Sequence, residues 1–595
     1  MRLVIFDFEV FKYDWTVTFL DMKSKETKFI HNNKRELRNY IEDKPLLCGW
    51  NNKWYDDWIL LALIKGADNL TLKSINDWII GGNNPWEHQF LAYTKKYPYS
   101  MDLRNDVYYG IGLKEIEGNL GMSIEEASIP WDLERPLTDE ELNEIKKYNI
   151  HDVKATMELF NQRKDYLKNK IFVGNMIGLP QYESLGLTNA KLSAKFLKAE
   201  KKLRHDERVF EFPENLDFNY IPDELIEFFE LSNDDSYTDD EIFKRKINVP
   251  FSQDMECIYG YGGVHAGKPN YWKNPNKKLY LSDVSSLYPT IMIEYDLLSR
   301  NVPNPELYKE IYDARLKAKA ENDYETSEAL KLIINTTYGA MLNKWNDLYD
   351  PRMGRHVPIY GQLFLTELLY KLLESCPTIE IINFNTDGIL YELDDSDYEI
   401  AQKVMREWEK KNRFKLDTEE VENIIQKDVN NYIASIDGKI KTKGSMVKCF
   451  GGGDFESNSI VVVANAIVNY FLEGKPVEQT ISETDNILDF QFIAKTGSSY
   501  LKTYYSKFDG ENHIKDYQEV QKVNRVYASK NKEDGTLYKY KEVEKEDETV
   551  PRYDKIANIP MHCKIDNSNN LLIKDIDKSW YVRYTKKRIK QYLGG

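Results

Sequence analysis

Long apolar runs and low-complexity blocks are both missing from this chain. A helix that spans a membrane needs about 20 consecutive, mostly apolar residues, and no stretch of the sequence comes close to that. The apolar stretch at the amino terminus is short and reaches an acidic residue at Asp7, which does not fit a signal peptide. The sequence therefore predicts a protein with no membrane partner, located in the cytoplasm.

Cysteine is scarce, and net positive charge is absent. The five cysteines have no metal-like spacing, which predicts a reducing compartment. The chain carries 81 Lys and Arg residues against 97 Asp and Glu residues, a formal net charge of -16. This balance argues mildly against nucleic acid as a partner, but it does not exclude one, because a basic channel can lie inside an acidic protein.

What the chain has is length and aromatic residues. Its 595 residues exceed the usual size of one domain, so we expect several domains with large cores. With 42% hydrophobic residues, 41 tyrosines and 25 phenylalanines, the composition is typical of a globular protein.

A short apolar strand that ends on a carboxylate is the first chemical signal. Residues 279–281 predict the strand, Asp283 follows it, and the small residues Ser285 and Ser286 predict a bend. A carboxylate beside such a bend can hold a divalent cation and face a phosphate chain. Taken alone, the stretch favours a plainer interpretation, in which Asp283 caps the next helix.

A helical pattern that starts near Ser327 carries the second signal. Lys331, Asn335 and Tyr338 lie at positions i, i+4 and i+7, so one helix face presents a cation, an amide and an aromatic ring. That combination suits a triphosphate with a base stacked beyond it. The alternative is a solvated helix face with a lone lysine.

The third signal is a predicted β-hairpin over residues 381–391. Two apolar runs flank Asn385-Thr386-Asp387-Gly388, and Asp-Gly is a strong turn signal. For an isolated hairpin, turn chemistry alone would account for Asp387.

Together and in this order, the three stretches resemble the polymerase motifs of family B DNA polymerases. The first motif, Asp-x-x-Ser-Leu-Tyr-Pro, is met in full by Asp283, Ser286, Leu287, Tyr288 and Pro289. The second, Lys-x3-Asn-x-x-Tyr-Gly, is met by Lys331, Asn335, Tyr338 and Gly339. The third, Tyr-x-Asp-Thr-Asp, is met in part, because Asn383 replaces the tyrosine and Asn385 the first aspartate. Asp387, the essential carboxylate by this resemblance, is retained.

The amino-terminal region carries a second set of carboxylates. Asp7 and Glu9 share one face of an apolar strand, Asp56 stands near a helix start, and Asp152 stands four residues after Tyr148 on a helical pattern from 140 to 160. Each pair alone fits a helix cap or a surface charge. In this order they resemble the 3′-5′ proofreading exonuclease motifs of the same family.

The resemblance implies roles for these residues. Asp7, Glu9, Asp56 and Asp152 would hold two metal ions, Tyr148 would orient the attacking water, and Asn51 and Tyr55 would hold the single-stranded 3′ end.

The resemblance also implies the architecture, a multidomain α/β and α+β protein. A ribonuclease-H-like exonuclease domain would precede a right-hand polymerase with palm, fingers and thumb. The expected boundaries are 1–165 for the exonuclease, 166–250 for a connector, 251–300 and 346–455 for the palm, 301–345 for the fingers, and 456–595 for the thumb.

Further substrate contacts follow from the same resemblance. On a helix from 306 to 319, Arg315 and Lys319 would form a cationic clamp with Lys331 on the incoming triphosphate. The glycine-rich loop Tyr261-Gly262-Gly263 would contact the template, although the family tyrosine is replaced by Gly260 and a plain turn fits as well.

Three residues near position 440 are further candidates for DNA contact. Tyr432 matches a family motif whose lysine is replaced by Asn430, and Lys441 and Lys443 alternate on one strand face. A solvated strand edge is the alternative for the two lysines.

The implied reaction is DNA synthesis from deoxynucleoside triphosphates on a primer-template. Asp283 and Asp387 would bind two Mg²⁺, for which Mn²⁺ is a candidate substitute, and Tyr288 would exclude a ribose 2′-OH. A compact enzyme of this type is typical of bacteriophages, which implies the host cytoplasm. We expect a monomer, with a helicase, a primase or a single-strand-binding protein as candidate partners.

The motif spacing bears on priming. Asp283 to Lys331 spans 48 positions and Lys331 to Asp387 spans 56, which leaves little room for the insertions of protein-primed polymerases. The prediction is a nucleic-acid-primed enzyme. A protein-primed polymerase, an exonuclease with a decayed polymerase half, and a non-catalytic nucleic-acid-binding protein remain alternatives.

Overall fold

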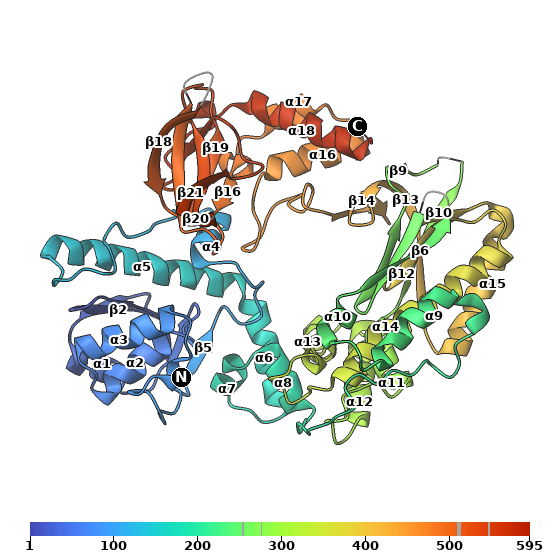
Figure 1. The fold of residues 1–595 in the computed structure, drawn as a ribbon, viewed down its shortest axis with the longest axis horizontal. Helices are drawn as coiled ribbons and strands as arrows, with labels where there is room; N and C mark the ends of the chain where they lie inside the picture. The colour runs from blue at the N-terminus through green and yellow to red at the C-terminus, as the bar shows by residue number, and fades with distance from the viewer. Residues whose placement is uncertain (253–254, 275, 509–512, 546–547, 595) are drawn as a thin grey trace. The chain divides into compact units, whose positions relative to one another are not determined.

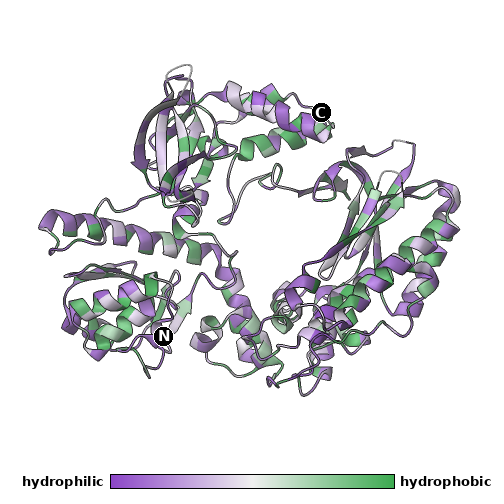
Figure 2. Cartoon of the chain, in the orientation of Figure 1, coloured by the Kyte–Doolittle hydropathy of each residue, from purple (hydrophilic) through white to green (hydrophobic). Residues whose placement is uncertain are grey.

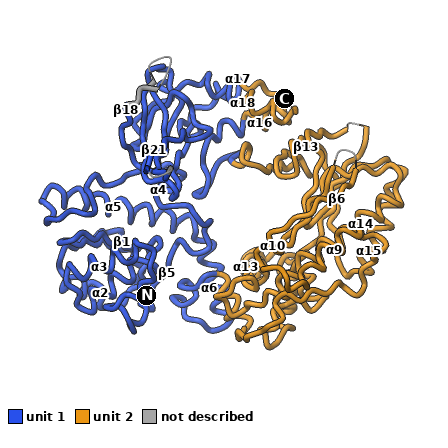
Figure 3. Tube along the Cα trace, in the orientation of Figure 1, with its two compact units in different colours: residues 1–188, 449–465, 478–584 blue, residues 189–448, 466–477, 585–595 orange. Residues whose placement is uncertain are grey.

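The computed structural model describes residues 1–252, 255–274, 276–508, 513–545 and 548–594, and the chain forms two compact units (Figures 1 and 3). The first unit contains residues 1–188, 449–465 and 478–584. The second contains residues 189–448, 466–477 and 585–595. The segment predicted as a thumb is therefore divided between both units, and the finer six-part division stays a prediction.

The first unit begins with a five-stranded mixed sheet in the order β3-β2-β1-β4-β5. β1 pairs antiparallel with β2 and parallel with β4, as the prediction of a mixed sheet requires. The strands are β1 (Leu3–Val10), β2 (Trp15–Asp21), β3 (Thr27–His31), β4 (Leu46–Gly49) and β5 (Ser100–Asp102).

Helices cover this sheet because its strands are apolar toward both faces. Phe6, Phe8 and Trp58 belong to the core on one face, while Ile5 and Val153 belong to the core on the other. The helices of this region carry green hydrophobic residues beside purple hydrophilic ones (Figure 2). They are α1 (Lys34–Tyr40), α2 (Asp56–Lys65), α3 (Asn69–Ile80), η1 (Pro85–Glu87), α4 (Leu113–Asn119), α5 (Asp139–Gln162), α6 (Lys164–Met176) and α7 (Gln181–Gly186).

Residues 492–565, here called the β segment, fold as strands that the sequence did not predict. They form a three-stranded sheet, β16-β19-β22, and a four-stranded sheet, β18-β17-β20-β21. The strands are β16 (Phe492–Lys495), β17 (Lys502–Phe508), β18 (His513–Val520), β19 (Val523–Ala528), β20 (Thr536–Lys545), β21 (Glu548–Lys555) and β22 (Cys563–Ile565). The helices around them in the sequence are α16 (Val461–Glu473), α17 (Val477–Glu483), η4 (Ile487–Phe490), η5 (Ile573–Asp575) and α18 (Lys578–Tyr592).

The second unit is built on a long antiparallel sheet in the order β15-β14-β13-β10-β12-β11-β8-β7-β6, with β9 paired to β13. The predicted strand at 279–281 is confirmed as part of β10, and the predicted hairpin is confirmed as β11 and β12. The strands are β6 (Lys246–Ser252), β7 (Met255–Gly260), β8 (Gly263–Gly267), β9 (Tyr271–Trp272), β10 (Lys278–Val284), β11 (Glu380–Asn385), β12 (Gly388–Leu393), β13 (Leu416–Asp428), β14 (Asn431–Ile436) and β15 (Lys439–Lys443).

Two consecutive helices, α12 and α13, confirm the predicted helix pair with a short link. Asp323 caps α13 by accepting the backbone N–H of Thr326 at 3.1 Å. The helices of this unit are α8 (Asn189–Phe196), η2 (Phe218–Tyr220), α9 (Asp223–Glu230), η3 (Leu231–Asn233), α10 (Asp239–Phe243), α11 (Leu287–Glu294), α12 (Glu306–Ala320), α13 (Tyr324–Met341), α14 (Pro351–Ser375) and α15 (Asp395–Asn412). Within the described ranges, none of the helices has both the length and the apolar character needed to cross a bilayer.

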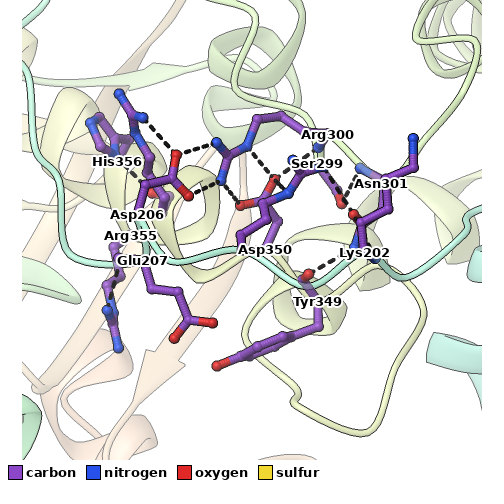
Figure 4. Close-up of polar contacts among 12 residues, drawn as sticks. Lys202, Asp206, Glu207, Ser299, Arg300, Asn301, Tyr349, Asp350, Arg355 and His356 are labelled. Atoms are coloured by element: carbon purple, nitrogen blue, oxygen red, sulfur yellow. Dashed lines mark hydrogen bonds and ion pairs between the residues drawn. The ribbon is translucent and has the colours of Figure 1, made fainter.

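An ion-pair network joins Asp206, in the part of the predicted connector that belongs to the second unit, to the rest of that unit (Figure 4). The guanidinium of Arg300 donates to Asp350 at 2.7 Å and to Asp206 at 2.5 Å, and Asp350 is fully buried. The hydrogen bond from Arg300 holds the pKa of Asp206 well below its usual range. The chain around Asp206, where the sequence revealed no chemical constellation, is thus held by charges that the fold brings together.

Candidate active sites

The amino-terminal carboxylate site consists of Asp7, Glu9, Asp56 and Asp152, and it lies wholly within the first unit. Oxygens of Asp7, Glu9 and Asp152 lie within 4.8 Å of one another, the first two from β1 and the third from α5. Asp56 begins α2 and accepts the backbone N–H of Phe8 at 2.9 Å, which brings it beside β1. The fold therefore gathers all four carboxylates that the sequence predicted as metal ligands.

Burial disfavours the charged forms of these four carboxylates and so raises pKa values in the group. Desolvation and the charge of Asp152 raise the pKa of Asp7 to about 8, and desolvation likewise raises the pKa values of Glu9 and Asp56. Carboxylate oxygens at this separation are the ligands that Mg²⁺ prefers, and a divalent cation would relieve their repulsion. The residues therefore fit a metal ion.

Lys114, on α4, is a member of this site that the sequence did not reveal. Its ammonium donates to Asp152 at 2.6 Å and to Glu117 at 3.1 Å. It also lies 4.5 Å from the ring centroid of Tyr148. Although burial opposes its charge, the attraction of Asp152 and Glu117 raises the pKa of Lys114 to about 12. Lys114 stands in no motif, so sequence spacing alone gave no signal for it.

The predicted contacts to the 3′ end lie on the segment before α2. The Tyr55 hydroxyl donates to Asn76 at 2.6 Å, and the Asn51 side chain accepts from Arg104 at 2.5 Å. Asn51 has a φ of 62°, and its N–H donates to the buried carboxylate of Asp102 at 2.8 Å. The segment is thus held in a fixed conformation next to Asp56, and its contact with DNA stays a prediction.

The helix that carries Lys114 is anchored to the β segment by a buried arginine. Arg525 is fully buried and donates to the carbonyl oxygens of Gly118 at 3.1 Å and Met122 at 2.8 Å. Its Nε donates to Gln491 at 2.7 Å. Since Gly118 lies on α4, one turn from Lys114, the β segment contributes to the position of the lysine.

The cleft site consists of Asp283 and Asp387, and it lies wholly within the second unit. Asp283 stands near the end of β10, and Asp387 stands in the turn between β11 and β12. The N–H of Val284 donates to the carbonyl oxygen of Asp387 at 2.8 Å, so the two stretches are adjacent. Gly388 pairs with Asp283 across the sheet, and a Cβ atom there would overlap with Asp283 Oδ1. A larger residue at position 388 would therefore displace the Asp283 carboxylate.

The cleft has room for a substrate. It has a volume of about 610 Å³, within the usual range of small-molecule sites. Its lining includes Asp283, Asp387, Tyr288, Tyr432 and Lys443. Burial and the charge of Asp387 raise the pKa of Asp283 to about 6. Two carboxylates that repel each other beside open space fit a divalent metal ion.

The predicted triphosphate contacts lie on α12 and α13, except Tyr288 on α11. The rings of Tyr288 and Tyr338 are in contact, with centroids 4.6 Å apart. Lys331 pairs with Glu328 on its own helix at 3.1 Å, a partner that the sequence did not indicate. Asn335 and Lys319 are exposed, while Nε of Arg315 is buried with no hydrogen-bond partner among the described residues. Binding of a triphosphate by these side chains stays a prediction.

The two asparagines that depart from the third motif form part of one hydrogen-bond chain. Asn385 donates to Asn383 at 2.7 Å, and Asn383 donates to the buried Gln426 at 2.8 Å. Both replacements therefore belong to the same packing arrangement, in which an amide takes the position of the first aspartate. Asp387 is not part of this chain.

The tyrosine of the glycine-rich loop, Tyr261, is a core residue and not the surface residue that was expected. Tyr261 is 6% exposed, and its hydroxyl donates to the carbonyl oxygen of Phe228 at 2.8 Å, so the side chain belongs to the core. Gly262 is exposed, and a Cβ atom at Gly263 would overlap with Thr386. If the loop contacts the template, it would do so through the backbone of its glycines, and this contact stays a prediction.

The remaining predicted DNA contacts border the cleft. Tyr432 pairs with Lys443 across β14 and β15, and the Lys443 ammonium lies 6.0 Å from the Tyr432 ring centroid. Lys441 pairs with Glu419 at 3.1 Å, and its charge opposes the rise in the pKa of Asp283. The fold brings these three residues toward the carboxylates, and their contact with DNA stays a prediction.

Two of three comparisons with known proteins find nothing similar. No family model matches the chain, and no curated protein matches it. Among solved structures, it is similar to the family B DNA polymerase from the hyperthermophilic archaeon Pyrobaculum calidifontis. The identity is 13%, the alignment covers 100% of this chain and 78% of that chain, and the TM-score is 0.39. The activity must therefore be inferred from the residues of this chain.

Proposed function

We propose that this protein is a DNA polymerase that copies a template by extending a primer 3′-OH and that also removes nucleotides from a DNA 3′ end. One observation carries the proposal. Asp283 and Asp387, distant in the sequence, meet at a cleft beside Tyr288, whose ring contacts Tyr338 of the helix that bears Lys331. Nucleotide transfer needs carboxylates that hold metal ions, an aromatic ring against the nucleotide and a cation for the phosphates, here Lys331.

In the cleft site, the side chains position the substrates. Asp283 and Asp387 would hold Mg²⁺, which when bound activates the 3′-OH and neutralises phosphate charge. Lys331 and Arg315 would bind the triphosphate, which requires Lys331 to leave Glu328. Tyr288 would pack against the sugar and favour deoxynucleotides. Sequence would be read by pairing with the template, so protein contacts would fall mainly on the DNA backbone.

In the amino-terminal carboxylate site, metal ions held by carboxylates would likewise promote hydrolysis of the DNA strand. Asp7, Glu9, Asp56 and Asp152 would hold Mg²⁺, Tyr148 would orient a water molecule, and Asn51 and Tyr55 would hold the strand. The mixed sheet that carries these residues supports a ribonuclease-H-like domain. We also propose that the second unit contains palm and fingers, that priming is by nucleic acid, and that the setting is bacteriophage replication in the host cytoplasm.

A labelled primer-template tests the proposal. Extension with Mg²⁺ and dNTPs, and degradation without dNTPs, are compared in the wild type, Asp387→Ala and Asp7→Ala, with exposed Asp235→Ala as the control. We expect Asp387→Ala to lose extension alone and Asp7→Ala to lose degradation alone. Each loss should reach roughly three orders of magnitude, because a metal ligand supplies several kcal/mol of transition-state stabilisation.

Asn385 motivates a second candidate function, an exonuclease whose cleft site is silent. The amide at this position removes one carboxylate from the cleft. If the wild type degrades the primer but does not extend it even with a terminal protein as primer, this second function replaces the first. Extension that requires the terminal protein would instead indicate protein priming.

A further inference from the structure

Two short stretches of the second unit, residues 201–203 and 344–345, form an exposed surface, here called the basic–apolar patch. They read Lys201-Lys202-Leu203 and Lys344-Trp345. Leu203 is 87% exposed and Trp345 is 79% exposed, and the three lysines are exposed as well. Neither stretch belongs to a motif that predicted a site.

A direct contact brings the two stretches together, although 143 positions separate Lys201 from Lys344. The Lys201 ammonium donates to the carbonyl oxygen of Lys344, and it lies 5.0 Å from the ring centroid of Tyr349. The Lys344 ammonium lies 5.1 Å from the Trp345 ring centroid. Lysines and large apolar side chains therefore share one surface, and apolar side chains that cluster in this way mark interaction sites.

One buried asparagine, Asn301, fixes both stretches from below (Figure 4). It is 2% exposed, and its Oδ1 accepts the N–H of Lys202 at 3.3 Å. Its Nδ2 donates to the carbonyl oxygens of Asp347 at 3.0 Å and Tyr349 at 2.8 Å. The backbone under the patch is thus set before any partner binds, which lowers the entropic cost of binding.

The charge of this surface is opposite to that of the whole chain. Residues 198–203 and 342–347 contain four lysines against two carboxylates, Glu200 and Asp347, whereas the chain has a formal net charge of -16. Complementary charge steers a partner toward a surface and rejects partners of like charge. The partner of the patch is therefore anionic.

The apolar side chains favour an acidic peptide over a nucleic acid. Leu342, at the end of α13, is 41% exposed and adds a second leucine beside Trp345. A single nucleic-acid strand binds by stacking its bases on aromatic rings, and leucine offers no such ring. Leucine can instead bury apolar side chains of a polypeptide, and tryptophan is among the residues that contribute most to protein–protein binding.

We propose that the basic–apolar patch binds an acidic segment of a partner protein, in which Asp or Glu residues alternate with large apolar side chains. The apolar side chains of this segment would pack on Trp345 and Leu203, and its carboxylates would pair with the three lysines. The patch would attach the partner to the second unit, so the inference goes beyond the proposed function and requires neither activity.

Fluorescence anisotropy with labelled synthetic peptides tests the proposal. The probe has four repeats of Asp-Asp-Phe. Four repeats of Asn-Asn-Phe lack its charge, and a poly-aspartate of equal length lacks its apolar groups. We expect the wild type to bind the probe at least about tenfold more tightly than either comparison peptide.

Two variants of the patch should bind the probe less tightly. Trp345→Ala should raise the Kd about thirtyfold, the loss typical of a central tryptophan. Lys202→Glu combined with Lys344→Glu should raise the Kd at least about tenfold and remove its increase with salt. Both variants should keep the Tm of the wild type, because the substituted side chains are exposed.

Trp272→Ala and Lys410→Glu are the matched controls, since both side chains are exposed in the same unit, and neither should change the Kd. Probe binding that the patch variants lose and the controls keep supports the proposal. No binding by the wild type, or equal losses in patch and control variants, overturns it. Oligo-dT of twelve nucleotides is measured alongside. If the patch variants lose affinity for oligo-dT while the wild type does not bind the probe, the proposal fails and the patch is a site for single-stranded nucleic acid.

Discussion

The two carboxylate sites of this chain hold groups of the same kind in different surroundings. In the amino-terminal site the carboxylates are held by Asn149, Phe8 and Lys114, and burial raises several pKa values. In the cleft site two carboxylates border open space, and their counter-charge Lys441 is itself exposed. Under the proposed function, the enclosed site would hydrolyse one strand end, whereas the open site would accept a new nucleotide at every step.

The two sites also differ in how far they depend on distant parts of the chain. The amino-terminal site takes its lysine from α4, which the β segment anchors through Arg525. The cleft site is assembled from neighbouring strands of one sheet, through the pairing of Asp283 with Gly388. Substitutions should therefore affect the two activities separately.

Apart from substitution of the carboxylates themselves, the largest effect is expected from Gly388→Ala. The added methyl group would displace the Asp283 carboxylate, and a displacement of about 1 Å can reduce a rate by roughly a hundredfold. Primer extension should fall by about that factor, while degradation of a single strand should not change. Gly260→Ala is the control, because a Cβ atom there meets atoms at 3.6 Å, an ordinary contact. Equal rates for both variants would contradict the requirement for glycine.

Lys114→Met should lower the stability and the activity of the amino-terminal carboxylate site. Its loss leaves buried carboxylates without their ion-pair partner, which costs about 3–5 kcal/mol in comparable pairs. We expect urea denaturation in EDTA to show a lower free energy of unfolding for the first unit, and exonuclease activity to fall at least about tenfold. Extension should not change. Lys147→Met removes an exposed lysine from α5 as the control. An exonuclease rate like that of the wild type would exclude a role for Lys114.

Arg525→Met should act on the same site from farther away. Removal of the guanidinium takes away the hydrogen bonds that Arg525 donates to the carbonyl oxygens of Gly118 and Met122, and of these two only Gly118 also accepts from Gln491, at 3.2 Å, so α4 should shift. A loss of roughly tenfold in degradation, with extension preserved, is the expected outcome. Arg525→Lys should recover part of it. The exposed Arg552→Met, on β21, should have no effect on either activity. If extension and degradation fell together, the anchor would be structural for the whole chain.

The smallest effect is a pH dependence of stability in the metal-free protein. The pKa of Asp7 is raised from 3.8 to about 8. Its contribution to the free energy of unfolding is therefore favourable below about pH 4 and is lost as the pH rises through 8. In thermal unfolding in EDTA, the Tm of Asp7→Asn should rise relative to that of the wild type between pH 4 and 8. The expected change is roughly 2–4 °C for each kcal/mol of stability that the wild type loses. Mg²⁺ should remove the difference by stabilising the wild type. A constant difference across this range would contradict the raised pKa.

Local patterns were sufficient to predict the strands, helices and turns that carry the motifs. The β-hairpin at Asp387, the strand before Asp283, the helix of Lys331 and the carboxylate parity of Asp7 and Glu9 follow from residue periodicity. They could be predicted because each depends on residues close in the sequence. The β segment was not predicted, although its sequence contains the turn signal Asp-Gly at 509–510 and at 534–535, because the pairing of its strands into two sheets depends on contacts between residues that are distant in the sequence.

By itself the sequence determined the residue types of both sites and their order along the chain. Only the tertiary structure decided their partners. It placed Lys114 against Asp152, Arg525 under α4, Tyr261 in the core, and Lys201 against Lys344. The physical reason is that a long-range contact depends on how sheets and helices pack, and packing is encoded by the whole chain rather than by any local pattern.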